Sequence, residues 1–265
     1  MNILITGALG LIGRALYNKL KLFHNVYGID KPYGLQISDI NKYDFKYYDL
    51  IIHCASNCII RDVIKHPYLM TENINNTISI MEYCRKHKTK VVLFSSSRVG
   101  TNNHNPYSTG KRFMEEISKA YYECYGVESI IIRPETIWGL NDNKKRVIPL
   151  WIKAAMNNKP LIIYGDNTKM LPPLYIDTFI DELLKIIFYK CSYNLIDYYK
   201  ITGYPMTAKE VAETIIKQTN SKSKIIYKKA ELSQPQQYDT SNTWYIGEPN
   251  NFENNLKKVL RGITK

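Results

Sequence analysis

The sequence predicts an α/β fold, in which a doubly wound parallel sheet is followed by a smaller C-terminal lobe. Three observations indicate this fold. Short β-branched runs alternate with segments of helical apolar spacing as far as about Gly139. The run at 49–56 (DLIIHCAS) is almost continuously apolar, which is typical of a strand buried on both faces. Three glycines join the first strand to the first helix. Strands that alternate with helices favour a parallel sheet with right-handed crossovers.

The expected elements follow one another in a regular order. Strands are expected at 2–6, 25–30, 49–56, 90–97 and 128–134, and helices at 11–22, 67–87 and 107–125. Beyond residue 140 the alternation breaks. There we expect helices over 147–156, 177–187 and 207–218, the last starting at a Thr cap, and a short strand over 160–165. No linker-like tract separates the two parts, so we expect them to share a core.

The composition narrows the class of protein. The 265 residues are 45% apolar, which fits one large domain or one and a half. No apolar run approaches the roughly 18 residues that span a bilayer, and residues 2–6 read as a core strand rather than a signal peptide. We therefore expect a cytoplasmic protein with no membrane contact. Five cysteines form no C-x-x-C pair and no metal-ligand cluster, so we expect reduced, buried thiols and no metal: Cys54, Cys58, Cys84, Cys124 and Cys191.

The net charge of +12 has two readings. It fits an anionic ligand such as a nucleotide diphosphate. It also fits a chain that is simply rich in Lys, Asn, Ile and Tyr. The lysines are scattered, with no run of five or more, so nucleic acid is not an expected partner.

Residues 6–13 (TGALGLIG) have the pattern of a phosphate-binding turn. Gly7, Gly10 and Gly13 are spaced three apart, which lets the backbone turn tightly and approach a pyrophosphate. The helix that begins at Leu11 and Ile12 then offers free N–H groups and the positive end of its dipole. The turn follows a strand and opens a helix, and this context predicts a dinucleotide site.

Asp30 stands at the end of the second expected strand. An acid there accepts hydrogen bonds from the adenosine ribose hydroxyls and repels a 2′-phosphate. NAD is therefore expected in preference to NADP, although Lys31 follows at once and could offset the repulsion.

Tyr107 and Lys111 are four residues apart near the start of a helix, in the run PYSTGK. This spacing puts them on one helical face. Lowering a phenol pKa from about 10 to about 7 requires roughly 4 kcal/mol, and an ammonium about 4 Å away supplies about that much at an effective dielectric near 20. We therefore expect Lys111 to make Tyr107 an acid–base group for a sugar hydroxyl, while a hydride moves to a nicotinamide.

Three serines, Ser95, Ser96 and Ser97, end the strand run KVVLFSSS. Parallel sheets bind ligands beyond the carboxyl ends of their strands. A serine there is placed to hydrogen-bond the reacting oxygen, although at least one of the three is expected to be an ordinary polar strand end.

Together these motifs resemble a known family. The pattern T-G-x-x-G-x-x-G, the strand DLIIHCAS, the strand end FSSS, PYSTGK and IRPETIWG are similar to those of the extended short-chain dehydrogenases/reductases. The resemblance covers most of 1–190. It implies a Rossmann-type NAD-binding domain over 1–139, with further elements interleaved to about residue 190, and a smaller substrate-binding lobe over 140–265. Members of that family are NAD-dependent epimerases, dehydratases and ketoreductases that act on nucleotide-sugars.

The resemblance also implies roles for matched positions. On the cofactor side it implies pyrophosphate contacts from the glycine turn, ribose contacts from Asp30 and Lys111, and contacts with the remaining cofactor from Asp39, Ile40, Ala55, Asn73 and Pro134. It implies Tyr107, Lys111 and a serine as catalytic residues, and Ser96 is our first choice, with Ser97 close behind. It implies a substrate side that includes Ser97, Arg98, Thr136 and Lys169. Family members often pair through the helix that carries Y-x-x-x-K, so a homodimer is a further expectation.

Several positions depart from the family pattern. The loop between Gly100 and Tyr107 is short, and so is the segment between Asp30 and Asp49, where a strand–helix unit is expected to be trimmed. Thr136 stands for the family asparagine, and Leu171 for an arginine that holds the substrate phosphate. Other basic residues are candidates to replace these contacts: Lys144, Lys145, Arg146 and Lys169.

The residues next to the serines narrow the choice of reaction. A dehydratase of the family has an Asp-Glu pair after the serine, where this chain has Ser97 and Arg98, and a 3,5-epimerising reductase has a cysteine there. Neither reaction is expected, although His104 remains a candidate for a further proton-transfer group. We expect a 4-epimerase that oxidises the sugar C4 transiently. The alternatives are an NAD(P)H-dependent reductase of nucleotide-4-keto-sugars and a nucleotide-binding module without catalysis.

Overall fold

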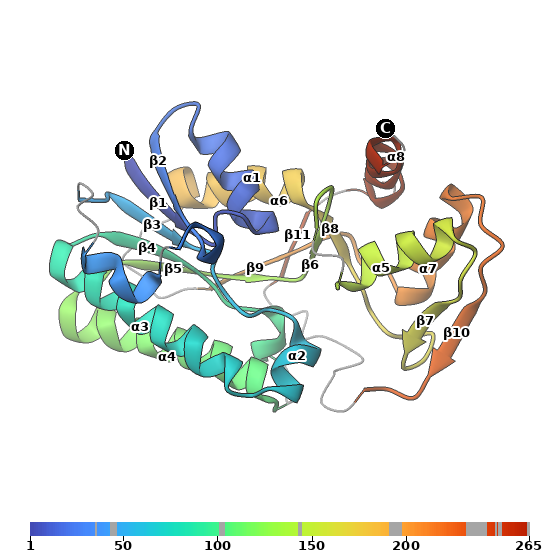
Figure 1. Cartoon of the computed structure of the whole chain (residues 1–265), viewed down its shortest axis with the longest axis horizontal. Coiled ribbons are helices and arrows are strands. Elements are labelled where there is room, and N and C mark those ends of the chain that lie inside the picture. The colour runs from blue at the N-terminus through green and yellow to red at the C-terminus, as the bar shows by residue number, and fades with distance from the viewer. Residues whose placement is uncertain are drawn as a thin grey trace.

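The structure, a computed structural model, describes residues 1–34, 36–42, 47–100, 104–142, 145–190, 198–231, 243–246, 248 and 251–263. Its centre is a parallel sheet of seven strands in the order β11-β9-β5-β4-β3-β1-β2 (Figure 1). These strands are β1 (Asn2–Thr6), β2 (Asn25–Ile29), β3 (Leu50–His53), β4 (Lys90–Phe94), β5 (Ser129–Pro134), β9 (Tyr198–Thr202) and β11 (Thr243–Tyr245). The strand order reverses between β1 and β3. The predicted doubly wound α/β fold is therefore confirmed.

Helices cover both faces of this sheet (Figure 1). One face carries α1 (Leu11–Leu20) and α6 (Ile176–Lys185), and the other carries α3 (Leu69–His87) and α4 (Pro106–Tyr125). Side chains alternate along each strand. In β1, Ile3 packs into the first core and Leu4 into the second. Burial on both faces explains the continuous apolar runs in the sequence.

The first edge of the sheet is trimmed. Between β2 and β3 the described residues form two short 3₁₀-helices, η1 (Lys31–Tyr33) and η2 (Ile37–Lys42). Strand β2 is consequently the edge strand at this side. The short segment between Asp30 and Asp49 in the sequence leads to this expectation, and the structure agrees with it.

A smaller part of the molecule stands beside the sheet. It contains α5 (Val147–Met156), α7 (Ala208–Gln218), α8 (Asn251–Ile263) and a pair of parallel strands, β7 (Leu161–Tyr164) and β10 (Ile225–Lys228). Its own apolar core includes Trp138, Trp151, Ile215 and Phe252. Two short parallel strands, β6 (Thr136–Trp138) and β8 (Pro173–Tyr175), lie where the two parts meet (Figure 1).

The chain passes between the two parts more than once. Elements α6, β9 and β11 come after residue 139, yet they belong to the layers of the large sheet. A π-helical segment (Ile186–Lys190) extends α6. The predicted boundary at residue 139 therefore divides the chain, but elements on its C-terminal side also belong to the large sheet. The boundary and the substrate-binding role of 140–265 stay predictions.

Two short connections complete the described elements. Helix α2 (Ile60–Lys65) follows β3, and a 3₁₀-helix, η3 (Ser97–Gly100), follows β4. None of the described helices combines the length and the apolar character that crossing a bilayer needs.

Candidate active site

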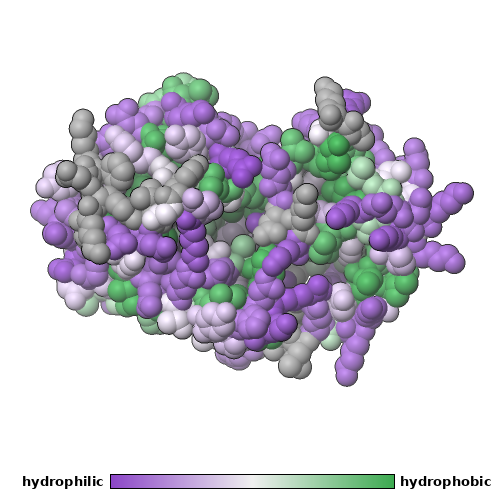
Figure 2. Space-filling model, viewed as in Figure 1, coloured by the Kyte–Doolittle hydropathy of each residue, from purple (hydrophilic) through white to green (hydrophobic). Residues whose placement is uncertain are grey.

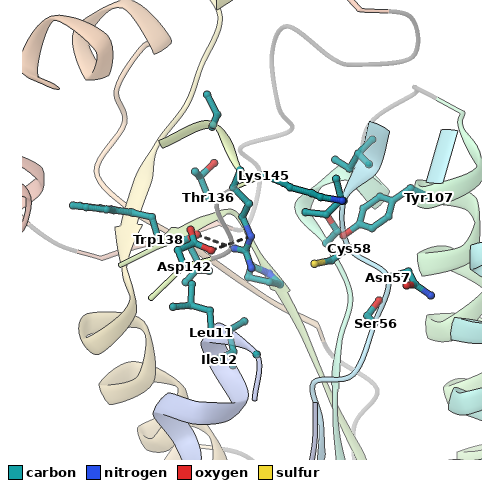
Figure 3. Close-up of a pocket in the computed structure, with 18 of the residues that line it drawn as sticks. Leu11, Ile12, Ser56, Asn57, Cys58, Tyr107, Thr136, Trp138, Asp142 and Lys145 are labelled. Atoms are coloured by element: carbon teal, nitrogen blue, oxygen red, sulfur yellow. Dashed lines mark hydrogen bonds and ion pairs between the residues drawn. The ribbon is translucent and has the colours of Figure 1, made fainter. Parts of the chain in front are cut away.

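A cavity of about 860 Å³ lies between the sheet and the smaller part of the molecule. Figure 2 shows the surface hollowed between these parts, on a face that hydrophilic residues largely cover. In Figure 3, Tyr107 and Cys58 lie on one side of the cavity, Thr136, Trp138 and Asp142 on the other, and α1 contributes Leu11 and Ile12. The cavity adjoins the carboxyl ends of β1, β3, β4 and β5, where open parallel sheets bind ligands.

Sixteen of the predicted site residues line this cavity. They are Gly7, Gly10, Leu11, Ile12, Gly13, Asp30, Ala55, Asn73, Ser96, Ser97, Arg98, Tyr107, Lys111, Pro134, Thr136 and Lys169. Two others, Asp39 and Ile40, are not among its lining residues. The roles of all these residues remain predictions, and the geometry below is what they rest on.

The glycine turn leaves no room for side chains. Gly7 has a φ of +67°, and a Cβ there would lie 2.7 Å from the main-chain nitrogen of Ala55. A Cβ on Gly13 would lie 2.1 Å from the carbonyl oxygen of Gly7. Helix α1 therefore starts close to the end of β1. Its first residues line the cavity, and no side chain on the glycines covers the main-chain N–H groups there. This is a cradle for an anion at a helix N-terminus.

Asp30 closes the cradle from the neighbouring strand. Its carboxylate accepts hydrogen bonds from the main-chain N–H groups of Leu9 and Lys31, both at 2.8 Å. A carboxylate has about four acceptor positions, so acceptor positions remain for ribose hydroxyls. The carboxylate is thus held at the rim of the cradle, which is the position the predicted role requires.

Asp39 and Ile40, for which the resemblance implies a contact beside adenine, are not among the residues that line the cavity, and their role stays a prediction. Ile40 is buried in the core beside the sheet, and Gln36 and Ile37 line the cavity instead. A 3₁₀-helix repeats every three residues, so Ile37 and Ile40 share one face of η2. Of these two, Ile37 is the one that reaches the cavity.

The wall above the glycine turn is formed by residues 54–58. Asn73 holds this wall: its side chain accepts a hydrogen bond from the N–H of Asn57 at 2.8 Å and donates one to the Asn57 carbonyl at 3.2 Å. The hydroxyl of Ser56 is buried and, among the described residues, has no hydrogen-bond partner. A cradle that a Cβ would fill, and a buried polar atom that needs a partner, both fit a bound dinucleotide.

The three serines at the end of β4 have three different partners. Ser95 donates to the carboxylate of Glu115, which also forms a buried ion pair with Arg133. The Ser96 side chain is hydrogen-bonded to the Tyr107 phenol. The Ser97 side chain is hydrogen-bonded to Glu135. Ser95 is thus the polar strand end that the sequence leads us to expect, and Ser96 is the serine paired with Tyr107.

Tyr107 lies in the first turn of α4. The helix begins with a capping box, in which the Asn105 side chain accepts from the N–H of Ser108 at 3.0 Å. Burial raises the pKa of Tyr107 to about 12, and Cys58 adds to the rise, whereas the hydrogen bond with Ser96 and the charges of Arg98 and Arg146 oppose it. The helix N-terminus also favours negative charge nearby.

Lys111 differs from the expectation. Its ammonium donates a hydrogen bond to the main-chain carbonyl of Phe94 at 2.6 Å. It is not among the groups that lower the pKa of Tyr107. Burial lowers the pKa of Lys111 itself to about 8, and Cys58, Glu115 and Cys54 counteract this. The expected lowering of the phenol pKa by Lys111 is therefore absent from this arrangement.

Several basic residues line the cavity on the side of the smaller part of the molecule. Lys169 donates to the carbonyl of Tyr164 at 2.8 Å. Arg146 pairs with Asp142 at 3.3 Å, and Asp142 points into the cavity in Figure 3. Leu171 is buried in the apolar core of that part, so it takes no polar role. Of the four basic candidates, Lys145, Arg146 and Lys169 line the cavity and Lys144 lies outside the described residues.

Helix α2 bridges to the smaller part at the same place. Arg61 pairs with Glu231 at 2.6 Å and stacks over the ring of Tyr164 at 4.7 Å. The next residue, Asp62, pairs with Lys145 at 3.3 Å. Two consecutive residues of α2 thus contact residues that lie beyond residue 139 in the chain.

The cysteines differ from the expectation of buried thiols. All four described cysteines are free, but only Cys84 is buried, Cys54 is half-buried, and Cys58 and Cys124 are exposed. Cys191 lies outside the described residues. Cys58 lines the cavity, and in Figure 3 its sulfur lies close to the Tyr107 phenol. His104, in contrast, is exposed and is not among the lining residues.

Other cavity residues were not predicted from the sequence. The main ones are Ser56, Asn57, Cys58, Arg61, Glu135, Trp138 and Asp142. Glu135 had a readable signal, because it is an acid that directly follows an expected central strand. Arg61 and Asp142 follow no motif in the sequence and had no such signal.

Comparison with known proteins identifies the class. Residues 3–189 match the model of the NAD dependent epimerase/dehydratase family, and the chain belongs to that family of enzymes. An uncharacterized UDP-glucose epimerase, YtcB of Bacillus subtilis, is 25% identical over 230 residues, 71% of this chain and 72% of that protein. The CDP-abequose synthase of Salmonella muenchen is 28% identical over 249 residues, which are 85% and 83% of the two chains.

Solved structures agree on the fold. The UDP-glucuronic acid 4-epimerase of Bacillus cereus, solved with UDP-glucuronic acid and NAD, superposes with a TM-score of 0.83. The two sequences are 20% identical, and the match covers 99% of this chain and 100% of the other. This likeness confirms the Rossmann-type fold. The family match over residues 3–189 confirms the extended short-chain dehydrogenase/reductase class and the family's dependence on NAD.

Proposed function

We propose that the protein is an NAD-dependent nucleotide-sugar 4-epimerase. One observation carries this proposal: the hydrogen-bonded pair of Tyr107 and Ser96 stands in the same cavity as the glycine cradle and Lys111. The pair offers a hydroxyl-directed acid–base group beside a dinucleotide site. Its neighbours in the family, which include 4-epimerases, support the same reading.

The residues divide the work at one sugar hydroxyl. When bound, NAD supplies a hydride acceptor and a positively charged ring. Tyr107 takes the proton of the C4 hydroxyl and later returns it, and Ser96 holds the same oxygen by a hydrogen bond. Arg98, Arg146 and the N-terminus of α4 favour the phenolate that this transfer needs. Lys111, anchored on the Phe94 carbonyl, presents its ammonium to ribose hydroxyls.

The basic part of the cavity suits a nucleotide diphosphate. Lys169, Lys145 and Arg146 line it. They would bind the substrate phosphates in place of the family contacts that Thr136 and Leu171 do not supply. Asp30 favours NAD over NADP, since its carboxylate at the rim of the cradle repels a 2′-phosphate.

The test is a product analysis with UDP-glucose and UDP-galactose in the presence of NAD. A C4 epimer with no net change in NAD is expected, and Tyr107→Phe is expected to lower turnover by about 10² to 10⁴ with similar affinity for NAD. Tyr125→Phe is the matched control, because Tyr125 is on the same helix but 58% exposed and outside the cavity. Stoichiometric consumption of reduced cofactor would instead identify a ketoreductase, and ligand binding without turnover would identify a binding module.

A further inference from the structure

We propose that Glu135 is a second acid–base residue of this site, which removes a proton from the carbon next to C4 of the bound sugar. The inference rests on the proposed function, because that proton becomes acidic only once C4 is a ketone. It adds a reaction, namely exchange or epimerisation at C3 or C5, that transfer at C4 alone does not include.

The position of Glu135 follows from the strand register. In the parallel pair of β4 and β5, Phe94 lies opposite Ile132. Ser97 begins η3 just beyond β4, Glu135 directly follows β5, and the two side chains are hydrogen-bonded. The main-chain N–H of Glu135 donates to the Ile201 carbonyl of β9 at 3.1 Å, which fixes the backbone at this edge. The pair of Ser96 and Tyr107 and the pair of Ser97 and Glu135 therefore line the same cavity, just beyond the carboxyl ends of β4 and β5.

Glu135 differs from the other described carboxylates that line the cavity. Asp30 is held by two main-chain N–H groups, and the remaining three are ion-paired: Glu72 with Lys31, Asp142 with Arg146, and Glu231 with Arg61. Glu135 has no ion-pair partner among the residues that the structure describes. Its side chain is hydrogen-bonded to the Ser97 hydroxyl, which leaves further acceptor positions on a carboxylate that lines the cavity.

Arg98 links the two acid–base groups. It acts electrostatically on Tyr107, on Glu135 and on Lys169. The phenol of Tyr107 and the carboxyl of Glu135 therefore line the same cavity as these basic residues. Burial raises the pKa of Glu135, whereas Ser97, Arg98 and Lys200 lower it. A carboxylate in such surroundings is a stronger base than one in water.

The step balances without another reactant. Oxidation at C4 leaves a ketone whose neighbouring C–H bonds are acidified. Glu135 takes the proton from one neighbouring carbon, and the electron pair of that C–H bond forms the carbon–carbon double bond of an enolate. The negative charge rests on O4, where Tyr107 and Ser96 donate hydrogen bonds. Return of a proton to the carbon restores the ketone, and a proton from solvent replaces the original one after Glu135 has exchanged.

Deuterium uptake tests the proposal. UDP-glucose is incubated with the enzyme and NAD in D₂O, and the recovered nucleotide-sugars are examined by mass spectrometry and proton NMR. We expect a mass increase of one, located at C3 or C5, together with the C4 epimer. In Glu135→Gln the ratio of deuterium to C4 epimer should fall at least about 20-fold, because the amide cannot take the proton. Glu116→Gln is the matched control, since Glu116 is exposed on α4, and it should keep the wild-type ratio.

The outcomes separate the two proposals. Wild-type enzyme that forms the C4 epimer without deuterium at carbon overturns the role of Glu135 and leaves the 4-epimerase intact. Deuterium uptake that survives unchanged in Glu135→Gln also overturns it. Absence of both the epimer and the deuterium removes the proposed function itself. Because the first result needs only the wild-type protein, a variant that fails to fold does not obscure the answer.

Discussion

Lys111 donates a hydrogen bond from its ammonium to the main-chain carbonyl of Phe94, at 2.6 Å, inside a site that buries both groups. The contact joins the first turns of α4 to the carboxyl end of β4. It fixes the lysine in the cavity that the glycine cradle also lines, where we predict that its ammonium binds the cofactor ribose. The same burial makes the charge unfavourable for folding, so function and stability oppose each other at this residue.

Replacing Lys111 tests that opposition. The pKa of Lys111 is lowered from 10.5 to about 8, which corresponds to about 3 kcal/mol of cost for the buried charge. Below pH 8 the ammonium is charged in the folded and unfolded states, so the full cost is present. Between pH 8 and 10.5 the folded state loses the proton first, and the cost disappears as the pH rises. Lys111→Met should thus unfold at higher denaturant than wild type at pH 7, while turnover is lost.

The same variant carries its own check on the pH dependence. The advantage of Lys111→Met over wild type should shrink between pH 7 and pH 10, as measured by urea unfolding at both values. If Lys111→Met is less stable than wild type at pH 7, or if the difference in their free energies of unfolding does not change with pH, the buried ammonium does not destabilise the fold.

Substitutions of the serines that follow β4 should affect stability and activity separately. Ser95→Ala removes a buried hydrogen bond to the charged Glu115 and should lower the free energy of unfolding by about 1 to 3 kcal/mol, with turnover nearly unchanged. Ser96→Ala removes the partner of Tyr107 and should lower turnover roughly 10²-fold, with little change in stability. Steady-state kinetics and denaturant unfolding of both variants measure the two effects, and equal effects would contradict the assignment of partners.

Asp30 should set the choice between NAD and NADP. Asp30→Asn keeps an oxygen that accepts from the N–H of Leu9 but removes the negative charge at the rim of the cradle. The ratio of the Kd for NADP to the Kd for NAD should fall about tenfold, or about 1.4 kcal/mol. Titration calorimetry with both cofactors measures it. An unchanged ratio would place the selectivity elsewhere, with Lys31 as the nearest candidate.

Lys169 should bind the substrate without taking part in the chemistry. Lys169→Met should raise the KM for the nucleotide-sugar about tenfold and change kcat little, because the contact is equal in the ground and transition states. Lys153→Met is the matched control, since Lys153 is exposed on α5 and outside the cavity. A fall in kcat with an unchanged KM would assign Lys169 to the reaction instead.

Local periodicity predicted the sheet well. The helix expected at 107–125 is α4 (Pro106–Tyr125), and the strand expected at 128–134 is β5 (Ser129–Pro134). The apolar spacing in α4 comes from burial of one helix face, and the continuous apolar run in β5 comes from burial on both faces of the sheet. Strands β9 and β11 were not predicted, because their positions depend on partners far away in the chain: β9 pairs with β5, and β11 with β9.

The site was predictable where its parts are close in sequence. The glycine turn and the Tyr107–Lys111 spacing are local, and the structure brings both to the cavity. Glu135, Cys58 and Arg61 join the site only because separate strands end at one edge of the sheet, which a linear pattern does not record. The direction of the Lys111 ammonium was also unpredictable, because it depends on which carbonyl the fold places within reach.

The paired contacts of Arg61 and Asp62 make the cavity's outer end sensitive to dissolved salt. Both ion pairs are partly exposed, and at an ionic strength near 0.1 M the screening length is about 10 Å. Raising the salt weakens the attachment of α2 to the smaller part of the molecule without reaching Tyr107 in its buried chamber. Product departure should therefore quicken with ionic strength, while proton transfer at the sugar proceeds as before.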